Sequence, residues 1–515
     1  MRPAESYDVI IIGTGAGGGT LARRLAPSGK RILILERGGF LPREKENWES
    51  KEVFEKMRYH TKEEWRDRDG KPFMAHTGYF VGGNTKVYGA AMFRLRERDF
   101  ETVQHKGGIS PEWPVKYRDF EPYYTQAEAL YDVHGQRGVD ETEPPMSADY
   151  PFPPFAHEPR ILELAERLQK KGRNPFHLPL ALKRNEADPL HSQCIRCSTC
   201  DGFPCLIDAK ADADLNGVRP AMQESSVTLL THARVKKILT NGSAREVSTV
   251  ETEIDGETHH FRGDIVVVAA GAINSAALLL GSASDKHPNG LANSSDLVGR
   301  NYMRHLNSAI LGMTTKKNPT VFQKTLAMND FYWGDEEFPF PMGHIQLLGK
   351  TDRGIIGADA PFFAPNLALD VMTKHSVDWW LTAEDLPDPE NRVTLTRDGQ
   401  IQLSQRDRYH EHFDRLVARW TEELKSVDAI DQVIPLSLYL KNKIPLMGVA
   451  HQNGTCRFGE DPKTSVLNIF CQTHDVDNLY VVDGSFFCSA GAVNPSLTIA
   501  ANALRVGDHI VERLG

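Results

Sequence analysis

A histidine and an asparagine in the last part of the chain have the types and surroundings expected of catalytic groups. His451 opens a polar, glycine-containing segment, HQNGTCR, and does not lie in an apolar stripe. A neutral imidazole, with a pKa near ~6.5, is the usual base for taking the proton of an alcohol while hydride leaves the adjacent carbon. Asn494 precedes Pro495, which favours an extended backbone and a fixed amide direction. On residue pattern alone, a structural histidine and a helix-capping asparagine are equally open interpretations.

A glycine-rich turn near residue 13 predicts a site for the ADP portion of a dinucleotide. Gly13, Gly15 and Gly18 form the pattern G-x-G-x-x-G, and Glu36 follows at the end of the next apolar run. The first two glycines permit a tight turn and close approach of a pyrophosphate, and the third allows close helix–strand packing. An acidic residue at this distance accepts hydrogen bonds from ribose hydroxyls. The pattern does not separate NAD from FAD, and a structural turn is the alternative.

The elements that must position this turn are short and apolar. Residues 7–12 and 31–35 are continuous β-branched and leucine-rich runs, as in strands buried on both faces, and residues 20–25 between them predict a helix. Such a strand–helix–strand unit of about 30 residues is the size of a dinucleotide-binding fold. Residues 227–240 and 250–268 predict further strands.

The rest of the chain differs in composition and in its pattern of apolar residues. Residues 111–189 look helical with proline-rich breaks, whereas residues 308–445 combine many aromatics with strand-like segments at 344–348 and 392–395. A charged helix is expected over 407–426, then a strand over 479–482 and a last helix from about residue 496.

The nucleotide-binding features thus occur at both ends and in the middle of the chain, which predicts a discontinuous domain. The expected fold class is α/β, with a Rossmann-like dinucleotide-binding domain and an α+β substrate-binding domain that contains an antiparallel sheet. The expected segments are 1–100, 206–307 and 446–515 for the first domain, and 101–205 and 308–445 for the second.

Composition fits a globular protein with a sizeable packed core. The chain has 515 residues, 40% hydrophobic and 25% charged, with a formal net charge of −9. This balance argues against nucleic acid or an anionic membrane as partner. The longest apolar stretch, 265–280, is broken by polar residues and is shorter than the ~20 residues of a spanning helix. The first residues show no basic-then-apolar leader, so a cytoplasmic protein is expected.

Four of the seven cysteines fall in one short stretch. Cys194, Cys197, Cys200 and Cys205 have the spacing C-x2-C-x2-C-x4-C. Four thiols this close could hold zinc or an iron–sulfur cluster, but the last spacing differs from the ferredoxin run. Free or locally paired thiols that pack a loop are the favoured interpretation, and no metal is assigned.

Taken together, these motifs resemble the glucose–methanol–choline (GMC) flavoprotein oxidoreductases. The matching stretches occur in the family's order: GTGAGGGTLARRLA, ILILERGG, GGNTKVYGAAMFR, VVVAAGAINSAALLL, HQNGTCRFG, NLYVVDGSFF and NPSLTIAANALRVGDHI. The resemblance implies FAD, a substrate hydroxyl oxidised by hydride transfer to flavin N5, and His451 and Asn494 facing that atom. It also implies cofactor contacts from Gly13, Gly15, Ala16, Gly18, Glu36, Arg37, Gly82, Gly83, Asn84, Thr85, Val235, Ala270, Gly271, Asp483, Gly484, Asn494 and Ser496.

Finer features of the motifs refine the expected mode of FAD attachment and the expected substrate class. Members with covalent FAD carry a histidine in the motif that here spans 82–88, which has none, so non-covalent FAD is expected. The pattern is most similar to bacterial pyranose oxidase-like enzymes, notably actinobacterial oxidases of C3 of glucose or C-glycosides. This implies a sugar or glycoside substrate and O2 or another electron acceptor. Aromatics between 331 and 380 are candidates for the substrate wall, with His344, Gln346, His451 and Asn494 as polar substrate contacts, although core packing is the plainer interpretation for most of the aromatics.

Two alternatives stay open. One is a dehydrogenase that passes electrons to a quinone or protein, and the other is a lyase of the same fold in which the flavin is not reduced. The oligomeric state is not predicted.

Overall fold

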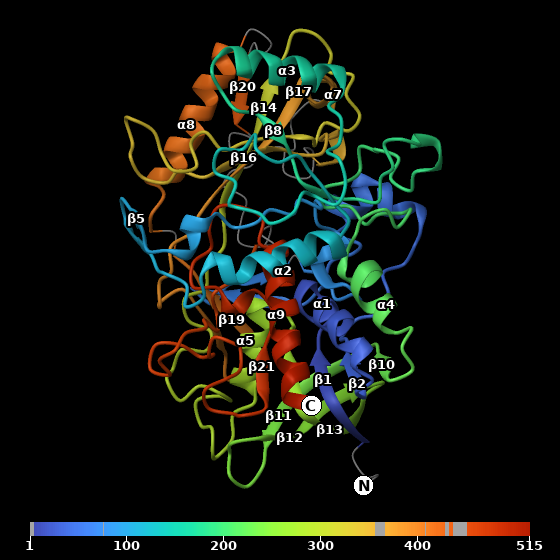
Figure 1. Cartoon of the computed structure of the whole chain (residues 1–515), viewed down its shortest axis with the longest axis vertical. Helices are drawn as coiled ribbons and strands as arrows, with labels where there is room; N and C mark the ends of the chain where they lie inside the picture. Colours follow the sequence, from blue (N-terminus) through green and yellow to red (C-terminus); the bar gives the residue numbers. More distant parts are fainter. Residues whose placement is uncertain (1–4, 76, 356–365, 407, 428–431, 436–450) are drawn as a thin grey trace.

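A seven-stranded sheet forms the lower half of the molecule in Figure 1. The structure is a computed structural model, which describes residues 5–75, 77–355, 366–406, 408–427, 432–435 and 451–515. The strand order is β10-β2-β1-β13-β12-β11, and β21 pairs with the second half of β13. The strands are β1 (Glu5–Ile12), β2 (Ile32–Leu35), β10 (Val227–Leu230), β11 (Ala233–Thr240), β12 (Val247–Ile254), β13 (Glu257–Val268) and β21 (Leu479–Val481).

The centre of this sheet is parallel and buried. β1 pairs in parallel with β2 on one side and with β13 on the other. Val9, Ile10 and Ile11 have no exposed surface, which explains why this strand is a continuous apolar run with no alternation. The predicted Rossmann-like arrangement is confirmed in this sheet, which draws its strands from three separate parts of the chain.

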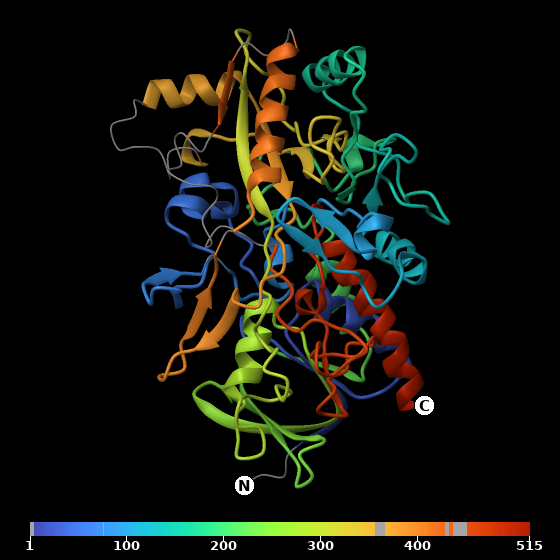
Figure 2. The same cartoon turned by 90° about the vertical axis from the view of Figure 1, so that its left-hand side faces the viewer.

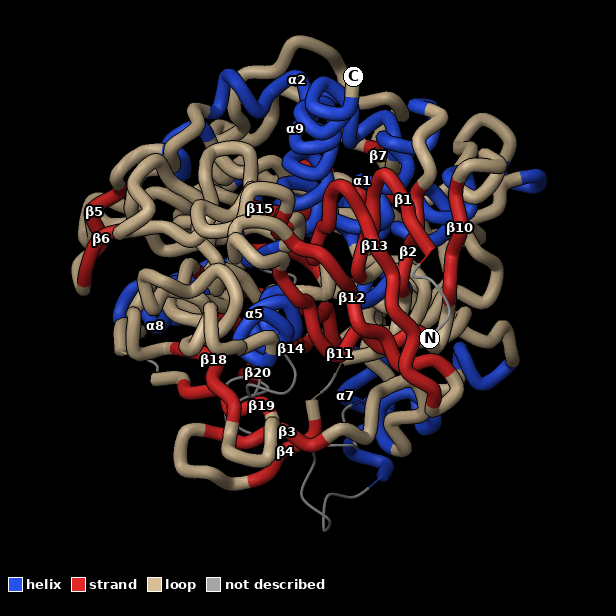
Figure 3. The backbone as a smooth tube through the Cα atoms, turned by 90° about the horizontal axis from the view of Figure 1, so that it is seen from below, coloured by secondary structure: helices blue, strands red, loops and turns tan. Residues whose placement is uncertain are grey.

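Helices cover both sides of the sheet (Figure 3). α1 (Ala16–Leu25) packs against α9 (Ser496–Leu514), which in turn contacts α2 (Tyr117–Leu130). α5 (Ala272–Gly281) instead packs against β11 and against β18 (Arg392–Leu395). The short helix α4 (Arg219–Ala221) also contacts α1.

The upper half of the molecule is built on a six-stranded antiparallel sheet, as predicted for the substrate-binding part. Its order is β20-β14-β17-β16-β15-β8. α8 (Glu411–Ser426) packs against β14 and β17, as Figure 2 shows, with Trp420 edge-on to Trp379 at a ring-centroid distance of 4.6 Å. The other elements here are β8 (Phe176–His177), β14 (Leu306–Met313), β15 (Leu326–Met328), β16 (His344–Leu347), β17 (Ser376–Ala383), β20 (Gln432–Pro435), α3 (Pro159–Lys170) and α7 (Asn366–His375).

A small third sheet joins parts of the chain that are far apart in sequence. β3 (Glu64–Asp67) pairs in parallel with β19 (Ile401–Ser404), and the order is β18-β19-β3-β4. β18 is Arg392–Leu395 and β4 is Pro72–Met74. Residues 64–74 therefore form one sheet together with residues 392–404.

Three expectations from the sequence differ from the structure. Residues 227–240 form two strands, not one, because the chain turns at His232 (φ +54°), and the two strands lie at different places in the sheet. Residues 250–268 belong to a hairpin, with Asp255 and Gly256 at φ values of +51° and +80° in its turn. In residues 111–189 the described α-helices are α2 and α3, and short strands and loops form the rest.

Candidate active site

One cavity of about 1330 Å³ begins at the carboxyl ends of the parallel strands, where ligands bind in open α/β sheets. Residues just after β1, β2 and β13 line it, and so do residues of the antiparallel sheet, including Gln346 and Trp380. His451 and Asn494 line the same cavity. The structure therefore brings the predicted nucleotide-binding and catalytic groups into one space.

The glycine-rich turn leaves open space where a phosphate would approach. A Cβ built on Gly15 meets no atom within 4 Å, whereas a Cβ on Gly17 or Gly18 would collide with a backbone carbonyl oxygen at 1.8 or 2.1 Å. Gly15 precedes the first residue of α1, so the free N–H groups and positive dipole end of this helix face the opening. The turn thus has the form of a phosphate cradle, and Gly18 serves in packing, not in lining the cavity.

Glu36 is held in place by the same turn. One carboxylate oxygen accepts a hydrogen bond from the backbone N–H of Thr14 at 3.1 Å, and the other accepts one from Gly38 N–H at 2.9 Å. Burial raises the pKa of Glu36, and these hydrogen bonds lower it in part. A carboxylate has about four acceptor positions, so Glu36 keeps capacity for a ribose hydroxyl.

Asp483 connects the C-terminal segment to the middle of the chain. Its carboxylate accepts hydrogen bonds from the backbone N–H groups of Gly271 at 2.9 Å and Ser485 at 2.8 Å, and from the hydroxyl of Ser275 at 2.5 Å. Burial raises the pKa of Asp483. This network fixes the turn before α5 against the loop that leads to α9.

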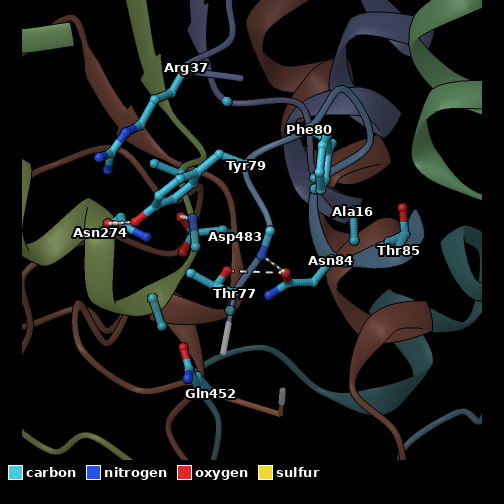
Figure 4. Close-up of a pocket in the computed structure, with 18 of the residues that line it drawn as sticks. Ala16, Arg37, Thr77, Tyr79, Phe80, Asn84, Thr85, Asn274, Gln452 and Asp483 are labelled. Carbon is cyan, nitrogen blue, oxygen red and sulfur yellow. Dashed lines mark hydrogen bonds between the residues drawn. The ribbon is translucent and has the colours of Figure 1, made fainter. Parts of the chain in front are cut away.

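Aromatic and charged side chains form another part of the wall (Figure 4). The guanidinium of Arg37 lies 3.9 Å from the ring centroid of Tyr79 and pairs with Glu63 at 3.0 Å. Tyr79 donates a hydrogen bond to Glu63 at 2.6 Å. Nearby, Oδ1 of Asn84 accepts from the Thr77 hydroxyl at 3.1 Å, so Asn84 is fixed by its own loop.

His451, the predicted base, and Trp380 lie side by side on the cavity wall. Their ring centroids are 5.1 Å apart, and His451 is half-buried. Burial lowers the pKa of His451 well below its ordinary value, and the neighbouring His305 and His344 lower it further. His451 is therefore neutral at pH 7, as a base for an alcohol must be.

Gln346 reaches the cavity, but His344 does not. His344 is fully buried, with Nδ1 2.7 Å from Oδ1 of Asn329 and Nε2 3.1 Å from Oε1 of Gln346. Asn329 in turn donates to Asp140 at 2.7 Å. Burial lowers the pKa of His344 to about 3. The expectation of His344 as a substrate contact is thus corrected, because the ring is fully buried and its two nitrogens face Asn329 and Gln346 instead of the cavity.

Most of the other predicted cofactor residues do line the cavity. They are Gly13, Gly15, Ala16, Glu36, Arg37, Gly83, Asn84, Thr85, Val235, Ala270, Gly271, Asp483, Gly484, Asn494 and Ser496. Gly82, at φ +95°, is not among the described lining residues and shapes the turn behind them. Of the aromatics proposed as a wall, Trp380 lines the cavity, whereas Phe331, Tyr332, Phe338 and Trp379 are buried in packing.

Sequence reasoning missed two features of the site. His305 lies behind His451, with the two Nδ1 atoms 2.9 Å apart. Lys324, fully buried, pairs with Asp201, and both line the cavity. In each pair the partners are more than a hundred positions apart, so no local motif marks them.

The cysteine stretch shows no metal geometry in the part of the chain that the structure describes. No three His, Cys, Asp or Glu side chains gather there as a metal site, and all four thiols are free. Burial raises the pKa of Cys194 to about 11 and that of Cys200 to about 12, so both are protonated thiols. Over the same described residues, no helix combines the length and the hydropathy needed to cross a bilayer.

Comparison with known proteins identifies the family of the chain. Models of the GMC oxidoreductase family match residues 7–307 and 437–503. The chain belongs to the GMC oxidoreductase family. It is an oxidoreductase of the alcohol-oxidising type with a flavin-binding domain, as the motifs predicted.

Two relatives and one solved structure show how close the likeness is. The chain is 29% identical to paromamine 6'-oxidase of Streptomyces fradiae, over 97% of this chain and 90% of that protein. It is 30% identical to 6'''-hydroxyparomomycin C oxidase of Streptomyces lividus, over 99% and 92%. The crystal structure of pyridoxine 4-oxidase from Mesorbium loti has a TM-score of 0.69 at 18% identity and covers 98% of each chain.

The residues present fit a flavin dinucleotide. The Gly15 opening, the α1 N-terminus and Glu36 suit a pyrophosphate and a ribose. The first residue of α9, Ser496, also lines the cavity, so a second helix N-terminus faces it. Its positive dipole end suits the negative charge of a reduced flavin ring.

Proposed function

We propose that this protein oxidises a secondary hydroxyl of a pyranose sugar, glucoside or C-glycoside to the keto sugar, at C3 with C2 as the lesser alternative. The observation that carries this proposal is the neutral His451 on the wall of a cavity that also holds Asn494, Gln346 and the ADP-binding turn. The two relatives described above are oxidases whose names refer to paromamine and a paromomycin, which supports a sugar-like substrate.

His451 takes the proton of the substrate hydroxyl, and the amide of Asn494 holds the same oxygen. Gln346 hydrogen-bonds a neighbouring hydroxyl, and Trp380 offers an aromatic face to the sugar ring. When bound, FAD supplies a hydride acceptor at N5 for the substrate carbon, and reoxidation by O2 with release of hydrogen peroxide completes the turnover. The alcohol thus loses a hydride and a proton and becomes a ketone.

We further propose that FAD is held non-covalently and that the protein acts in the cytoplasm. The motif 82–88 contains neither His nor Cys, and no Cys is among the described residues that line the cavity. Acid precipitation tests the first point, because a non-covalent flavin then stays in the supernatant.

A visible spectrum of the purified protein, followed by anaerobic mixing with excess glucose or a C-glucoside, tests the proposed reaction. Bleaching of the flavin bands is the expected result, and recovery with peroxide on admission of air makes the protein an oxidase. Bleaching without recovery in air favours a dehydrogenase that uses a quinone or protein acceptor. A flavin that stays oxidised while the substrate is cleaved overturns the proposal in favour of a lyase.

A further inference from the structure

His305 is a fully buried imidazole directly behind the candidate base. It immediately precedes β14, and its ring lies at 84° to the ring of His451, with centroids 4.9 Å apart. The two Nδ1 atoms are 2.9 Å apart, which is a hydrogen-bond distance. Only one of these nitrogens can carry the proton between them.

The hydrogen bond at Nε2 of His305 determines which of the two Nδ1 atoms carries this proton. Nε2 of His305 lies 3.3 Å from the carbonyl oxygen of Ala490, and a carbonyl can only accept. The single proton of a neutral His305 is therefore on Nε2, and its Nδ1 accepts. Burial lowers the pKa of His305 to about 4, so the ring is neutral at pH 7.

It follows that His451 donates from Nδ1 to His305. A neutral imidazole has one N–H, so Nε2 of His451 then carries the free lone pair. The neighbouring Trp380 ring, 5.1 Å away, further limits reorientation of His451.

We propose that His305 is a positioning residue that holds His451 in the Nδ1–H tautomer and leaves Nε2 as the proton-accepting atom. This inference rests on the proposed alcohol oxidation for its kinetic consequence, but the tautomer itself does not depend on the substrate. Two successive hydrogen bonds, from His451 to His305 and from His305 to Ala490, therefore fix the tautomer of His451 before any substrate binds.

The direct test is ¹⁵N NMR of the holoenzyme labelled with ¹⁵N-histidine, with His451→Asn used to assign the His451 signals. The expected result at pH 7 is a protonated Nδ1 and an unprotonated Nε2 for His451. In His305→Leu the Nδ1–H form loses its acceptor, and the Nε2–H form becomes populated. A wild-type His451 protonated at Nε2 overturns the proposal.

The kinetic test is anaerobic stopped-flow reduction of the flavin by the sugar. His305→Leu is expected to lower the rate constant by about 10- to 100-fold, the size of effect known for removal of the partner that orients a metal-bound histidine. FAD content and the substrate dissociation constant should stay unchanged. His305→Asn retains an acceptor oxygen near the Nδ1 position and should recover most of the rate. Equal loss in both variants, or no loss in His305→Leu, contradicts the proposal.

His134→Leu is the matched control. His134 is also a buried histidine that contacts a backbone carbonyl, that of Pro153 at 2.7 Å, and it does not line the described cavity. It should lose stability but reduce its flavin at the wild-type rate. If no sugar reduces the wild-type flavin, the proposed substrate class fails, while the NMR result still decides the role of His305.

Discussion

The backbone N–H of Ala490 donates a 3.0 Å hydrogen bond to Oε1 of Glu384. The same oxygen accepts from Gly491 N–H at 3.1 Å and from the Ser110 hydroxyl at 2.7 Å. A single buried carboxylate just after β17 thus fixes the loop that supplies the carbonyl acceptor for His305 and continues to Asn494.

Replacing Glu384 by Leu should displace this loop. Two buried N–H groups would lose their acceptor, at a cost of about 1–3 kcal/mol each in the free energy of unfolding. We expect a lower melting temperature and flavin reduction about 10- to 100-fold slower. Glu384→Gln keeps an acceptor oxygen and is the control. A Glu384→Leu variant that is destabilised but reduces its flavin at the normal rate would show that the loop keeps its position by other means.

Removal of the base should slow the chemical step. His451→Ala leaves the phosphate turn and Glu36 intact, so FAD should stay bound, while flavin reduction falls by about 10²- to 10⁴-fold, the range for loss of a general base. Stopped-flow mixing with the sugar measures this rate, and the flavin absorbance measures retention. A loss of less than about tenfold would remove His451 from the role of base.

The pH dependence follows from the lowered pKa of His451. The base works only when neutral, and burial, together with His305 and His344, makes protonation harder. The rate constant for flavin reduction should therefore stay constant as pH falls through ~6.5 and should decrease only at lower pH. A pH series of the anaerobic reduction checks this. A decrease centred at or above the ordinary histidine pKa would contradict a neutral, desolvated base.

A side chain at Gly15 should block the cofactor. A Cβ there meets no atom within 4 Å, so Gly15→Val places its methyl groups in the cavity beside the α1 N-terminus, where we expect the pyrophosphate to bind. The variant should fold but should be purified with little flavin. The ratio of flavin absorbance (about 450 nm) to protein absorbance (about 280 nm) measures the flavin content. Gly242→Val is the control, because its Cβ also meets no atom within 4 Å but lies in the β11–β12 turn. Equal flavin content in the two variants would exclude this placement of the pyrophosphate.

Gln346 should affect substrate binding more than chemistry. Its amide lies on the cavity wall and is held from behind by His344 at 3.1 Å. Loss of one hydrogen bond, about 1–1.5 kcal/mol, should raise the dissociation constant of the sugar about tenfold in Gln346→Leu. The limiting rate of flavin reduction should change little, and the same titration measures both quantities. An unchanged dissociation constant would place the sugar elsewhere in the cavity.

The sequence predicts best those elements that are formed by residues close together in the chain. The continuous apolar run before Gly13 predicts a buried parallel strand because side chains on both of its faces are covered, and β1 is such a strand. The hairpin at Asp255–Gly256 was missed although Asp-Gly between two strand-like runs is a strong turn signal.

The contacts behind the site could not be read from the sequence in this way. His305 and His451 lie 146 positions apart, and only the packing of β14 beside the C-terminal loop brings their rings together. His344 shows the opposite error. Its residue type suggested a substrate contact, but the alternation of side chains along β16 does not decide whether a buried polar group faces a cavity or a hydrogen-bonded network.

The pairing of β21 with β13 has a consequence for synthesis of the protein. Val482 N–H donates to Val268 at 2.8 Å, and the carbonyl of Val482 packs directly against Gly17 of the phosphate turn. Translation at ~5–20 residues per second needs roughly 10–40 s to pass from β13 to β21. Throughout that time the edge of β13 next to its carboxyl end is unpaired and open to wrong partners. The phosphate turn therefore gains its packing against Val482, and the cavity gains the part of its wall that residues 451–499 form, only after the last part of the described chain has been synthesised.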